Sequence, residues 1–319
     1  MEMPLLQVKN LKTYYQTARG YVKAVDGVNF QIEEGEVFGL AGESGCGKTT
    51  VALSIIRLLP PGGRIIDGKI IFNDKNILTM SEEDIRKIRW KKIAIVFQGA
   101  MNALNPVIKV GDQIVEAITT HENVSKEDAW KRTEKLFEMV GIDPSRAKDY
   151  PHEFSGGMKQ RVMIAMALAC NPQLLIADEP ATALDVIVQA QILKLMRELQ
   201  RKMNLSMMLI THDLSIIAET CNKVAIMYAG KIVEYADTKR IFRDPQHPYT
   251  RGLINAFPSI RGPKRKLISI PGTPPDLLNP PSGCRFHPRC PYTNDKCKKI
   301  EPELKDIGER HYVACHMSW

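Results

Sequence analysis

The sequence has no long apolar run. Its longest apolar stretches, such as VMIAMALAC at residues 162–170, fall well short of the roughly 18 to 20 residues that a membrane-spanning helix requires. The first residues, MEMPLLQVKN, also lack the basic segment and apolar core of a signal peptide. We therefore expect a chain that does not cross a bilayer and stays in the cytoplasm, where disulfides are not the default.

Cysteine, proline and excess positive charge are scarce in most of the chain and gather near its end. Residues 242–319 carry 13 Lys and Arg against 7 Asp and Glu, within a net charge of +8. The last 36 residues hold 4 of the 7 cysteines, and the last 79 hold 12 of the 20 prolines. This predicts a separate, loop-rich module at 242–319. Its basic charge indicates either a solvated surface or a partner such as lipid headgroups, nucleic acid or an anionic cofactor.

Residues 1–241 alternate short apolar runs with amphipathic stretches, which is the pattern of an α/β domain. A helical insertion is predicted at about 99–165, where strand signals vanish and Ser125 and Gly141 bound a helix. Elsewhere we predict strands at 37–42, 92–98, 174–180 and 206–213, a helix at 48–59 ended by Pro60, and a hairpin at 223–236 turning at Ala229 and Gly230.

A phosphate-binding loop is the strongest motif. The segment GESGCGKT, at residues 42–49, fits G-x-x-x-x-G-K-[ST] between a predicted strand and a predicted helix. Its backbone N–H groups would converge on phosphate oxygens, Lys48 would reach the β and γ phosphates, and Thr49 would bind Mg²⁺. The loop residues are Gly42, Glu43, Ser44, Gly45, Cys46, Gly47, Lys48 and Thr49, with Thr50 adjacent. Cys46 lies at a helix N-terminus, where the pKa of a thiol tends to fall, so we expect sensitivity to thiol reagents.

Two carboxylates follow the apolar run LLIA. Asp178 and Glu179 stand at the mouth of a strand, where open α/β sheets bind ligands. Asp178 is the natural Mg²⁺ partner, and Glu179 can orient or polarise the attacking water. The segment FSGGMKQR adds a second anion-binding helix end, with Ser155 as its cap followed by Gly156 and Gly157. A second cradle in one chain suggests the γ-phosphate of an ATP held by another subunit.

GESGCGKT, FSGGMKQR, LLIADEP, ATALD and ITHD, in this order, resemble the ATP-binding subunits of ABC transporters over residues 1 to about 240. The resemblance implies a P-loop NTPase with a RecA-like core, an antiparallel β subdomain and an α-helical insertion. It also implies two subunits that sandwich two ATPs. By matching motif, Gln98 would sense Mg²⁺ and couple to membrane subunits, Asp185 would lie at the dimer interface, and His212 would touch the γ-phosphate. Tyr15 is the first choice to stack on adenine, with Tyr14 and Tyr21 as alternatives.

The segment RDPQHPYTRGLINAFP at 243–258 and the following PGTPPDL resemble the C-terminal extension of the ATPases of dipeptide, oligopeptide and nickel importers, closest to the D-type subunit. This implies a peripheral protein on the cytoplasmic face of the cell membrane. It would pair with a second ATPase, either a different chain or a second copy. Two integral-membrane permeases would be direct partners, an extracytoplasmic peptide-binding protein would act indirectly, and nucleic acid would not be a partner.

The tail cysteines are spaced C-x5-C-x6-C-x17-C, without the C-x2-C knuckles usual for structural zinc. Cys284, Cys290, Cys297 and Cys315 supply the four thiolates of a [4Fe-4S] cluster, which the resemblance also favours. Zinc, with help from His287, His311 or His316, and free thiols or a disulfide are the alternatives. A cluster would be negatively charged, so Arg285, Arg289, Lys296, Lys298 and Lys299 would be suitable neighbours.

Two other functions stay open at this point. A nickel importer would use the same ATPase, because the cargo never touches this chain. A soluble ABC-type ATPase acting on nucleic acid or ribosomes would use the basic tail for phosphate contacts. That second class usually carries paired ATPase cassettes or long coiled coils, and neither is visible in the sequence. A redox protein with the cluster as its active centre would need a second redox cofactor or docking site, and none is readable.

Overall fold

A computed structural model describes residues 3–99, 103–182, 184–256 and 270–317. The chain divides into two compact units. Unit 1 comprises residues 1–33, 37–79 and 210–319, and unit 2 comprises 34–36 and 80–209. Ala183 of the ATALD segment, residues 100–102 of the predicted insertion and residues 257–269 of the basic tail lie outside the described residues.

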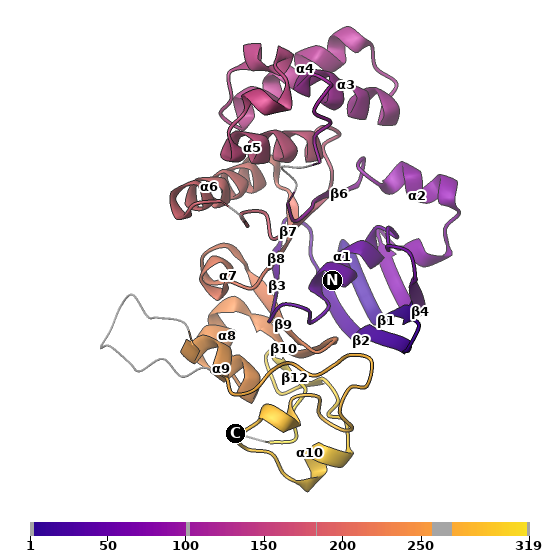
Figure 1. Ribbon diagram of the computed structural model, residues 1–319, viewed down its shortest axis with the longest axis vertical. Coiled ribbons are helices and arrows are strands. Elements are labelled where there is room, and N and C mark those ends of the chain that lie inside the picture. Colours follow the sequence, from indigo (N-terminus) through magenta and orange to yellow (C-terminus); the bar gives the residue numbers. More distant parts are fainter. Residues whose placement is uncertain (1–2, 100–102, 183, 257–269, 318–319) are drawn as a thin grey trace. The chain divides into compact units, whose positions relative to one another are not determined.

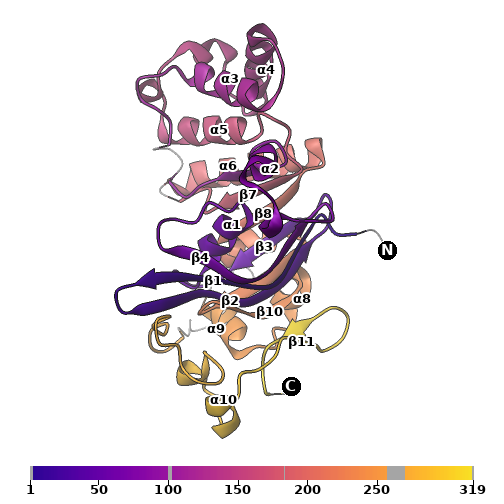
Figure 2. The same ribbon diagram turned by 90° about the vertical axis from the view of Figure 1, so that its right-hand side faces the viewer.

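Unit 1 contains an antiparallel sheet of order β2-β1-β4-β5 (Figure 2). Its long central strand pairs on both sides, since Leu6 faces Ile32 across one edge and Phe72 across the other. All three of these side chains are buried, so one face of the sheet forms core. The strands are β1 (Leu6–Thr17), β2 (Gly20–Ile32), β4 (Gly63–Phe72) and β5 (Lys75–Asn76).

Unit 1 also contains the first parallel strand of the predicted α/β core. The five residues of β3 are all buried and pair in parallel with β9, as expected for a strand covered on both faces. The predicted hairpin is confirmed, because β9 and β10 are antiparallel and Ala229 and Gly230 both have positive φ. The strands are β3 (Val37–Ala41), β9 (Lys223–Tyr228), β10 (Lys231–Asp237), β11 (Lys305–Asp306) and β12 (Tyr312–Val313).

The C-terminal tail is part of unit 1. Its strand β12 pairs with β10, with Glu234 opposite Val313, so the tail extends the edge of this sheet. Figure 1 shows the yellow, last part of the tail, which includes β12, beside β10. The helices of unit 1 are α1 (Lys48–Ile55), α7 (Leu214–Thr220), α8 (Thr238–Arg243), α9 (Pro248–Ala256) and α10 (Asp295–Lys299), with short 3-10 turns at Ile77–Thr79 and His287–Arg289.

The helix after the phosphate loop is shorter than predicted. It ends at Ile55, well before Pro60. Leu58 N–H donates to Leu53 O, and Arg57 N–H donates to Ser54 O. Together with the positive φ of Arg57, these bonds form the left-handed ending that closes many helices. The proline therefore follows a helix that has already been closed.

Unit 2 contains the residues of the predicted helical insertion. Ser125 and Ser155 cap α4 and α5 through the backbone N–H groups of Asp128 and Met158, as predicted. Between residues 103 and 168, the described residues form helices, turns and loops, and α3, α4 and α5 pack on one another (Figure 1). The helices are α2 (Glu82–Ile88), α3 (Val110–His121), α4 (Lys126–Met139), α5 (Gly156–Ala167) and α6 (Val186–Met203), with 3-10 turns at Pro144–Lys148 and Pro151–Glu153.

The strands of unit 2 support the second half of the predicted site. β6 and β7 are parallel, and Val96 pairs with Ala177, so the residues that follow both strands leave the same edge of the sheet. The predicted strands are thereby confirmed. They are β6 (Ile93–Val96), β7 (Leu174–Asp178) and β8 (Ser206–Thr211), the last of which ends in unit 1.

Candidate functional site

The phosphate loop connects β3 to α1 in unit 1. Lys48 is 6% exposed, and its Nζ donates to the carbonyl oxygens of Gly42 at 2.7 Å and Glu43 at 3.0 Å. A Cβ at Gly42 would lie 2.1 Å from Met227 O, and one at Gly47 would lie 2.1 Å from Ala24 O. Both glycines also have positive φ. The motif glycines are therefore required by close packing as well as by backbone conformation.

Around the start of α1, Thr49 is exposed and Thr50 is buried. Of the two threonines, Thr49 is therefore the one that is open to solvent. The expected fall in the pKa of the Cys46 thiol is wrong. Its side chain is 5% exposed, and burial raises the pKa of the thiol despite the neighbouring Lys48. Desolvation of the thiolate outweighs the helix N-terminus and the lysine charge.

The three candidate tyrosines have different surroundings. The hydroxyl of Tyr14 donates to Asp26 at 2.8 Å, and burial together with this carboxylate raises the pKa of Tyr14 to about 12. Tyr15 is half-buried beside the loop, with its hydroxyl 3.3 Å from that of Thr50. Tyr21 is 48% exposed. Tyr14 is thus tied into the sheet, whereas Tyr15 lies next to the first turn of α1.

Unit 2 brings Gln98 and Glu179 together. Asp178, the last residue of β7, is 1% exposed. Glu179 follows with φ 46°, a left-handed conformation that is uncommon for a residue with a side chain. Its Oε2 accepts hydrogen bonds from Gln98 Nε2 at 3.3 Å and from Thr182 Oγ1 at 2.9 Å. Strain of this kind clusters at functional sites and fits a placed catalytic carboxylate.

The glycines of the second anion cradle begin α5. Ser155 and Gly156 are exposed and Gly157 is half-buried. A Cβ at Gly157 would lie 2.6 Å from Val188 Cγ1. Glycine therefore lets the start of α5 pack closely against α6. Asp185 caps α6 by accepting from Val188 N–H at 2.9 Å.

The predicted nucleotide residues thus fall into two groups. Unit 1 holds Tyr15, His212 and residues 42–50, while unit 2 holds Gln98, Asp178, Glu179, the cradle at 155–157 and Asp185. His212 is exposed and precedes α7. Each group contains the residue types that ATP and Mg²⁺ require. Carboxylate, hydroxyl and amide oxygens are ligands that Mg²⁺ prefers.

The tail cysteines lie near one another. Cys284 N–H donates to Cys297 O at 2.8 Å. Burial, together with the charges of Cys315, Cys297 and Cys290, raises the pKa of Cys284 to about 11. Even so, within the described ranges no three Cys, His, Asp or Glu residues converge closely enough to hold a single metal ion.

The histidines proposed to help zinc are engaged elsewhere. His311 Nε2 lies 2.7 Å from Glu234 Oε1, and both residues are buried. His316 Nε2 lies 2.8 Å from Ile300 O, and His287 Nδ1 lies 2.9 Å from Cys284 O. The three histidines proposed as additional zinc ligands therefore have other hydrogen-bond partners.

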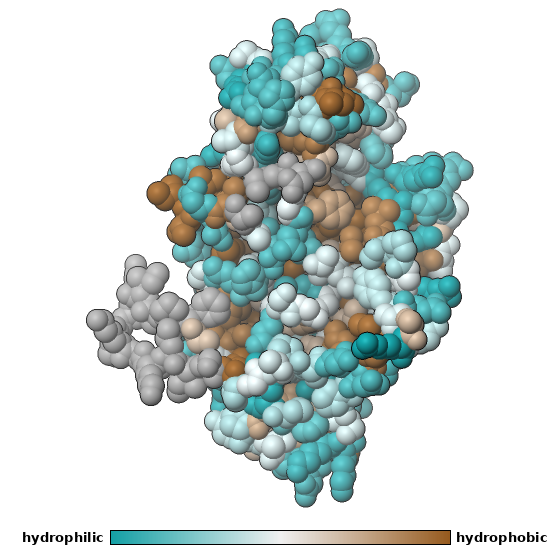
Figure 3. Space-filling model, viewed as in Figure 1, coloured by the Kyte–Doolittle hydropathy of each residue, from teal (hydrophilic) through white to brown (hydrophobic). Residues whose placement is uncertain are grey.

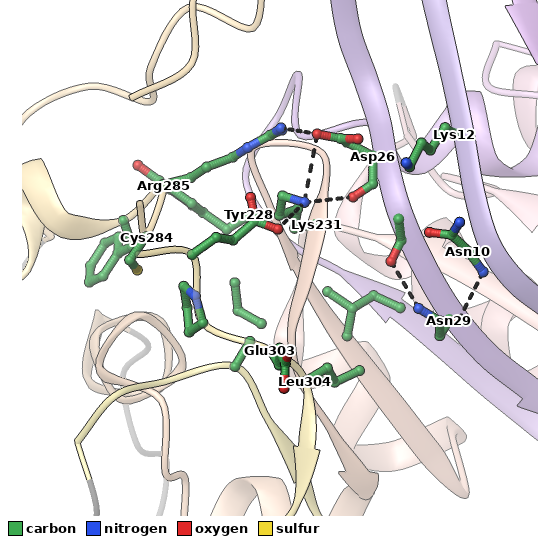
Figure 4. A pocket seen from close by; sticks show the side chains of 17 residues that line it. Asn10, Lys12, Asp26, Asn29, Tyr228, Lys231, Cys284, Arg285, Glu303 and Leu304 are labelled. Atoms are coloured by element: carbon green, nitrogen blue, oxygen red, sulfur yellow. Dashed lines mark hydrogen bonds and ion pairs between the residues drawn. The ribbon is translucent and has the colours of Figure 1, made fainter. Parts of the chain in front are cut away.

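Two of the basic residues expected around a cluster point elsewhere. Arg285 binds Asp26 and Ala229 O, and Arg289 binds Glu43 of the phosphate loop. Figure 4 shows Arg285 and Lys231 both directed at Asp26, in a cavity of about 530 Å³ that Cys284 also lines. Sequence reasoning missed these contacts because the partners are far apart in the chain. Arg289 and Glu43, for example, are 246 residues apart.

The comparisons with known proteins agree with this geometry. The family described as "ABC transporter" matches residues 25–182, and "Oligopeptide/dipeptide transporter, C-terminal region" matches 233–297. A dimeric ATP-binding cassette in a post-hydrolysis state, bound to ADP and Pi, is similar with a TM-score of 0.66 and 27% identity, covering 73% of this chain and 98% of that one. The fold and loop thus define a P-loop ATPase of the ABC class.

Relatives align over almost the whole chain. The dipeptide transport ATP-binding protein DppD of Bacillus subtilis is 48% identical over 98% of this chain and 94% of its own. The oligopeptide transport ATP-binding protein OppD of Escherichia coli is 46% identical over 98% and 92%. The chain belongs to the ATP-binding subunits of oligopeptide and dipeptide ABC transporters. Among the described residues, no helix combines the length and apolar character needed to span a bilayer.

Proposed function

We propose that this chain is the ATP-hydrolysing subunit that powers an ABC importer for dipeptides or oligopeptides. The observation that carries the proposal is the full-length similarity to relatives named for dipeptide and oligopeptide transport, which includes the C-terminal region at 233–297. A shared ATPase core alone would identify the ATP hydrolysis but not the transported substrate. The C-terminal region narrows the cargo, because that family is described by the same substrates.

The nucleotide chemistry follows from the residues of the two units. Lys48 and the backbone of the phosphate loop would hold the phosphates, Tyr15 would stack on adenine, and Thr49 and Asp178 would hold Mg²⁺. Bound Mg²⁺ neutralises charge on the phosphates. Glu179 orients and polarises the attacking water, and its hydrogen bond from Gln98 holds the carboxylate in place. His212 would contact the γ-phosphate and stabilise charge that develops there.

A second ATPase subunit would complete the site. Ser155, Gly156 and Gly157 present a capped helix start to an anion, and each chain needs only one phosphate loop for its own nucleotide. Next to Asp185, Val186 and Ile187 are 80% and 73% exposed. Figure 3 shows apolar atoms on the surface over α6. Exposed apolar residues beside an interface motif support protein contact there. The partner is a different ATPase or a second copy of this chain.

Membrane attachment would be indirect. In the proposed complex, two permease subunits carry the peptide across the membrane, and a binding protein delivers it from outside. Gln98 lies on the loop that follows β6, beside the exposed Phe97, and this loop would transmit nucleotide state to the permeases. The chain would then lie on the cytoplasmic face of the cell membrane.

Transport measurements test the function directly. Deletion of the gene should abolish uptake of a labelled dipeptide or tripeptide. The parent gene should restore uptake, and the Glu179→Gln variant should not. Labelled nickel and an unrelated amino acid serve as alternative cargoes. Unchanged peptide uptake in the deletion strain, together with loss of nickel uptake, would assign the chain to the nickel alternative.

We further propose that the four tail cysteines hold a [4Fe-4S] cluster. Support comes from the mutual proximity of the thiols, because the charges of Cys290, Cys297 and Cys315 all act on Cys284. Zinc gathers four sulfurs around one ion at Zn–S distances of about 2.3 Å. A cubane gives each cysteine its own iron, so the sulfurs lie farther apart. A cluster therefore tolerates a wider spacing of the four sulfurs than a zinc site does.

The cluster is tested on anaerobically purified protein. A broad absorption near 400 nm, about four iron and four sulfide per chain, and no zinc are expected. Cys290→Ser should remove most of the iron, while Cys170→Ser, a buried cysteine in unit 2, should not. Stoichiometric zinc without iron would contradict the proposal.

A further inference from the structure

The phosphate loop is held by the C-terminal tail through one residue, Glu43. Tyr249 on α9 accepts the backbone N–H of Glu43 at 3.0 Å. Arg289 donates two parallel hydrogen bonds to the carboxylate, from NH1 to Oε2 at 2.6 Å and from NH2 to Oε1 at 3.0 Å. Lys48 Nζ donates a hydrogen bond to the backbone carbonyl oxygen of Glu43 at 3.0 Å. All three polar groups of Glu43 are therefore engaged, and two of them by the tail.

Arg289 is itself fixed in place. It is 7% exposed, and its Nε donates to Pro271 O at 2.8 Å. Its NH1 also lies 3.4 Å from the hydroxyl of Tyr228, whose ring packs against Tyr249 and Phe286 with centroids 4.6 Å and 5.2 Å away. For a buried arginine in a bidentate ion pair, leaving its partner costs free energy, because the buried charge would be unpaired. The tail therefore presents a rigid cation to the phosphate loop.

The charge of Glu43 makes this contact relevant to nucleotide binding. The loop is built to attract anions through its backbone N–H groups and Lys48. A carboxylate on the second residue of that loop opposes phosphate binding unless it is neutralised and kept in place. Arg289 supplies the opposite charge, and Tyr249 fixes the backbone on which the neighbouring N–H groups depend.

We propose that Arg289, with Tyr249, is a positioning residue of the nucleotide site, through which the C-terminal tail sets the affinity of the phosphate loop for ATP and ADP. The inference rests on the proposed ATPase function. Arg289 does not touch the nucleotide itself and acts only through Glu43. Because Cys290 is the next residue, the conformation of the cysteine segment is joined to the loop by this ion pair.

The test is a double-mutant cycle on the full-length chain, with affinity for Mg·ADP measured by calorimetry so that hydrolysis does not interfere. Arg289→Gln should weaken ADP binding at least about tenfold, because it leaves the Glu43 carboxylate unpaired. Against a Glu43→Gln background, the same change should cost less than about threefold, because no charge is left to neutralise.

Arg285→Gln is the matched control. Arg285 is as buried as Arg289, at 6% exposed, and also sits next to a cluster cysteine, but its carboxylate partner is Asp26. Its substitution should lower thermal stability comparably, with any loss of ADP affinity the same in the parent and the Glu43→Gln background. A loss that depends on Glu43 for Arg289 but not for Arg285 would distinguish positioning from general damage to the tail.

Two further variants guard against a misfolded protein. Arg289→Lys keeps the charge without the paired geometry, and Tyr249→Phe removes only the hydroxyl. Each should weaken ADP binding by a few fold. Parent affinity in folded Arg289→Gln, or in both milder variants, would overturn the inference while leaving the proposed function intact. Failure of the parent chain to bind ADP would overturn both.

Discussion

Gln98 Nε2 donates to Glu179 Oε2 across 3.3 Å, joining two side chains that follow neighbouring parallel strands. The pairing of Val96 with Ala177 sets this proximity, because Gln98 lies two residues after Val96 and Glu179 lies two residues after Ala177. The left-handed φ of Glu179 then ends the extended backbone of β7 and sets the direction of the carboxylate. The two residues are thus placed by the sheet itself rather than by a long loop.

Replacement of Glu179 by Gln should reduce steady-state ATP hydrolysis by about 10²- to 10⁴-fold, the usual contribution of a positioned general base. Nucleotide affinity should stay close to that of the parent, because the amide keeps the shape and one hydrogen-bonding oxygen. Phosphate release and ADP affinity measure the two effects separately. Glu198→Gln, an exposed carboxylate on α6, is the control and should hydrolyse normally. Hydrolysis at the parent rate by Glu179→Gln would contradict the assignment.

Most of the local structure could be predicted because its causes are local. The phosphate-loop glycines, the serine caps of α4 and α5 and the turn at Ala229 and Gly230 each depend on neighbouring residues. The failures involve long-range packing. Cys46 is at a helix start, as predicted, yet burial decides its pKa.

The contacts of Arg285 and Arg289 were missed for a related reason. Beside clustered cysteines, a basic residue suggests a partner for a charged cluster. The fold instead directs both guanidinium groups to carboxylates near the start of the chain, Asp26 and Glu43. Nothing local to either arginine encodes that choice, since it depends on β12 joining β10 and on α9 packing beside the phosphate loop.

Tyr15→Ala should weaken ADP binding by about 1 to 3 kcal/mol, the usual value of one base stacked on an aromatic ring. Tyr15→Phe should retain most of the affinity, since stacking needs the ring and not the hydroxyl. Tyr14→Phe loses the bond to Asp26, so it should reduce stability more than nucleotide affinity. Fluorescence titration with a labelled adenine nucleotide compares the three. If Tyr21→Ala weakened binding and Tyr15→Ala did not, Tyr21 would be the stacking residue.

Cys46 should resist alkylation in the native protein. Its thiol is buried, and its raised pKa keeps the reactive thiolate scarce near neutral pH. We expect modification by iodoacetamide at least about tenfold slower in buffer than in urea, where the thiol regains its ordinary pKa. Quantitative mass spectrometry of the Cys46 peptide gives both rates. Equal rates in the two solvents would show that the loop opens freely and that burial does not protect the thiol.

His247 should make the stability of the fold fall in mild acid. The residue is 1% exposed, and its Nδ1 accepts the Tyr249 N–H at 3.1 Å. Burial lowers the pKa of His247 to about 4, although Glu234 opposes the shift. In the unfolded chain the pKa is about 6.5, so the unfolded state takes up the proton first as pH falls. The stability that the neutral His247 imidazole gives to the fold is therefore complete above about pH 7 and is lost between about pH 6.5 and 4.

The size of this loss is on the order of 3 kcal/mol, from 1.36 kcal/mol for each unit of pKa difference. Urea unfolding of the parent and of His247→Asn at pH 7.5, 6 and 5 measures it. Asn can still accept the Tyr249 N–H but does not titrate, so the variant should lose less stability than the parent between pH 7.5 and 5. His152→Gln, an exposed histidine, should keep the parent slope. If His247→Asn and the parent lost stability equally, the acid sensitivity would have to come from other groups, since removal of a buried titrating imidazole must flatten the pH dependence that it causes.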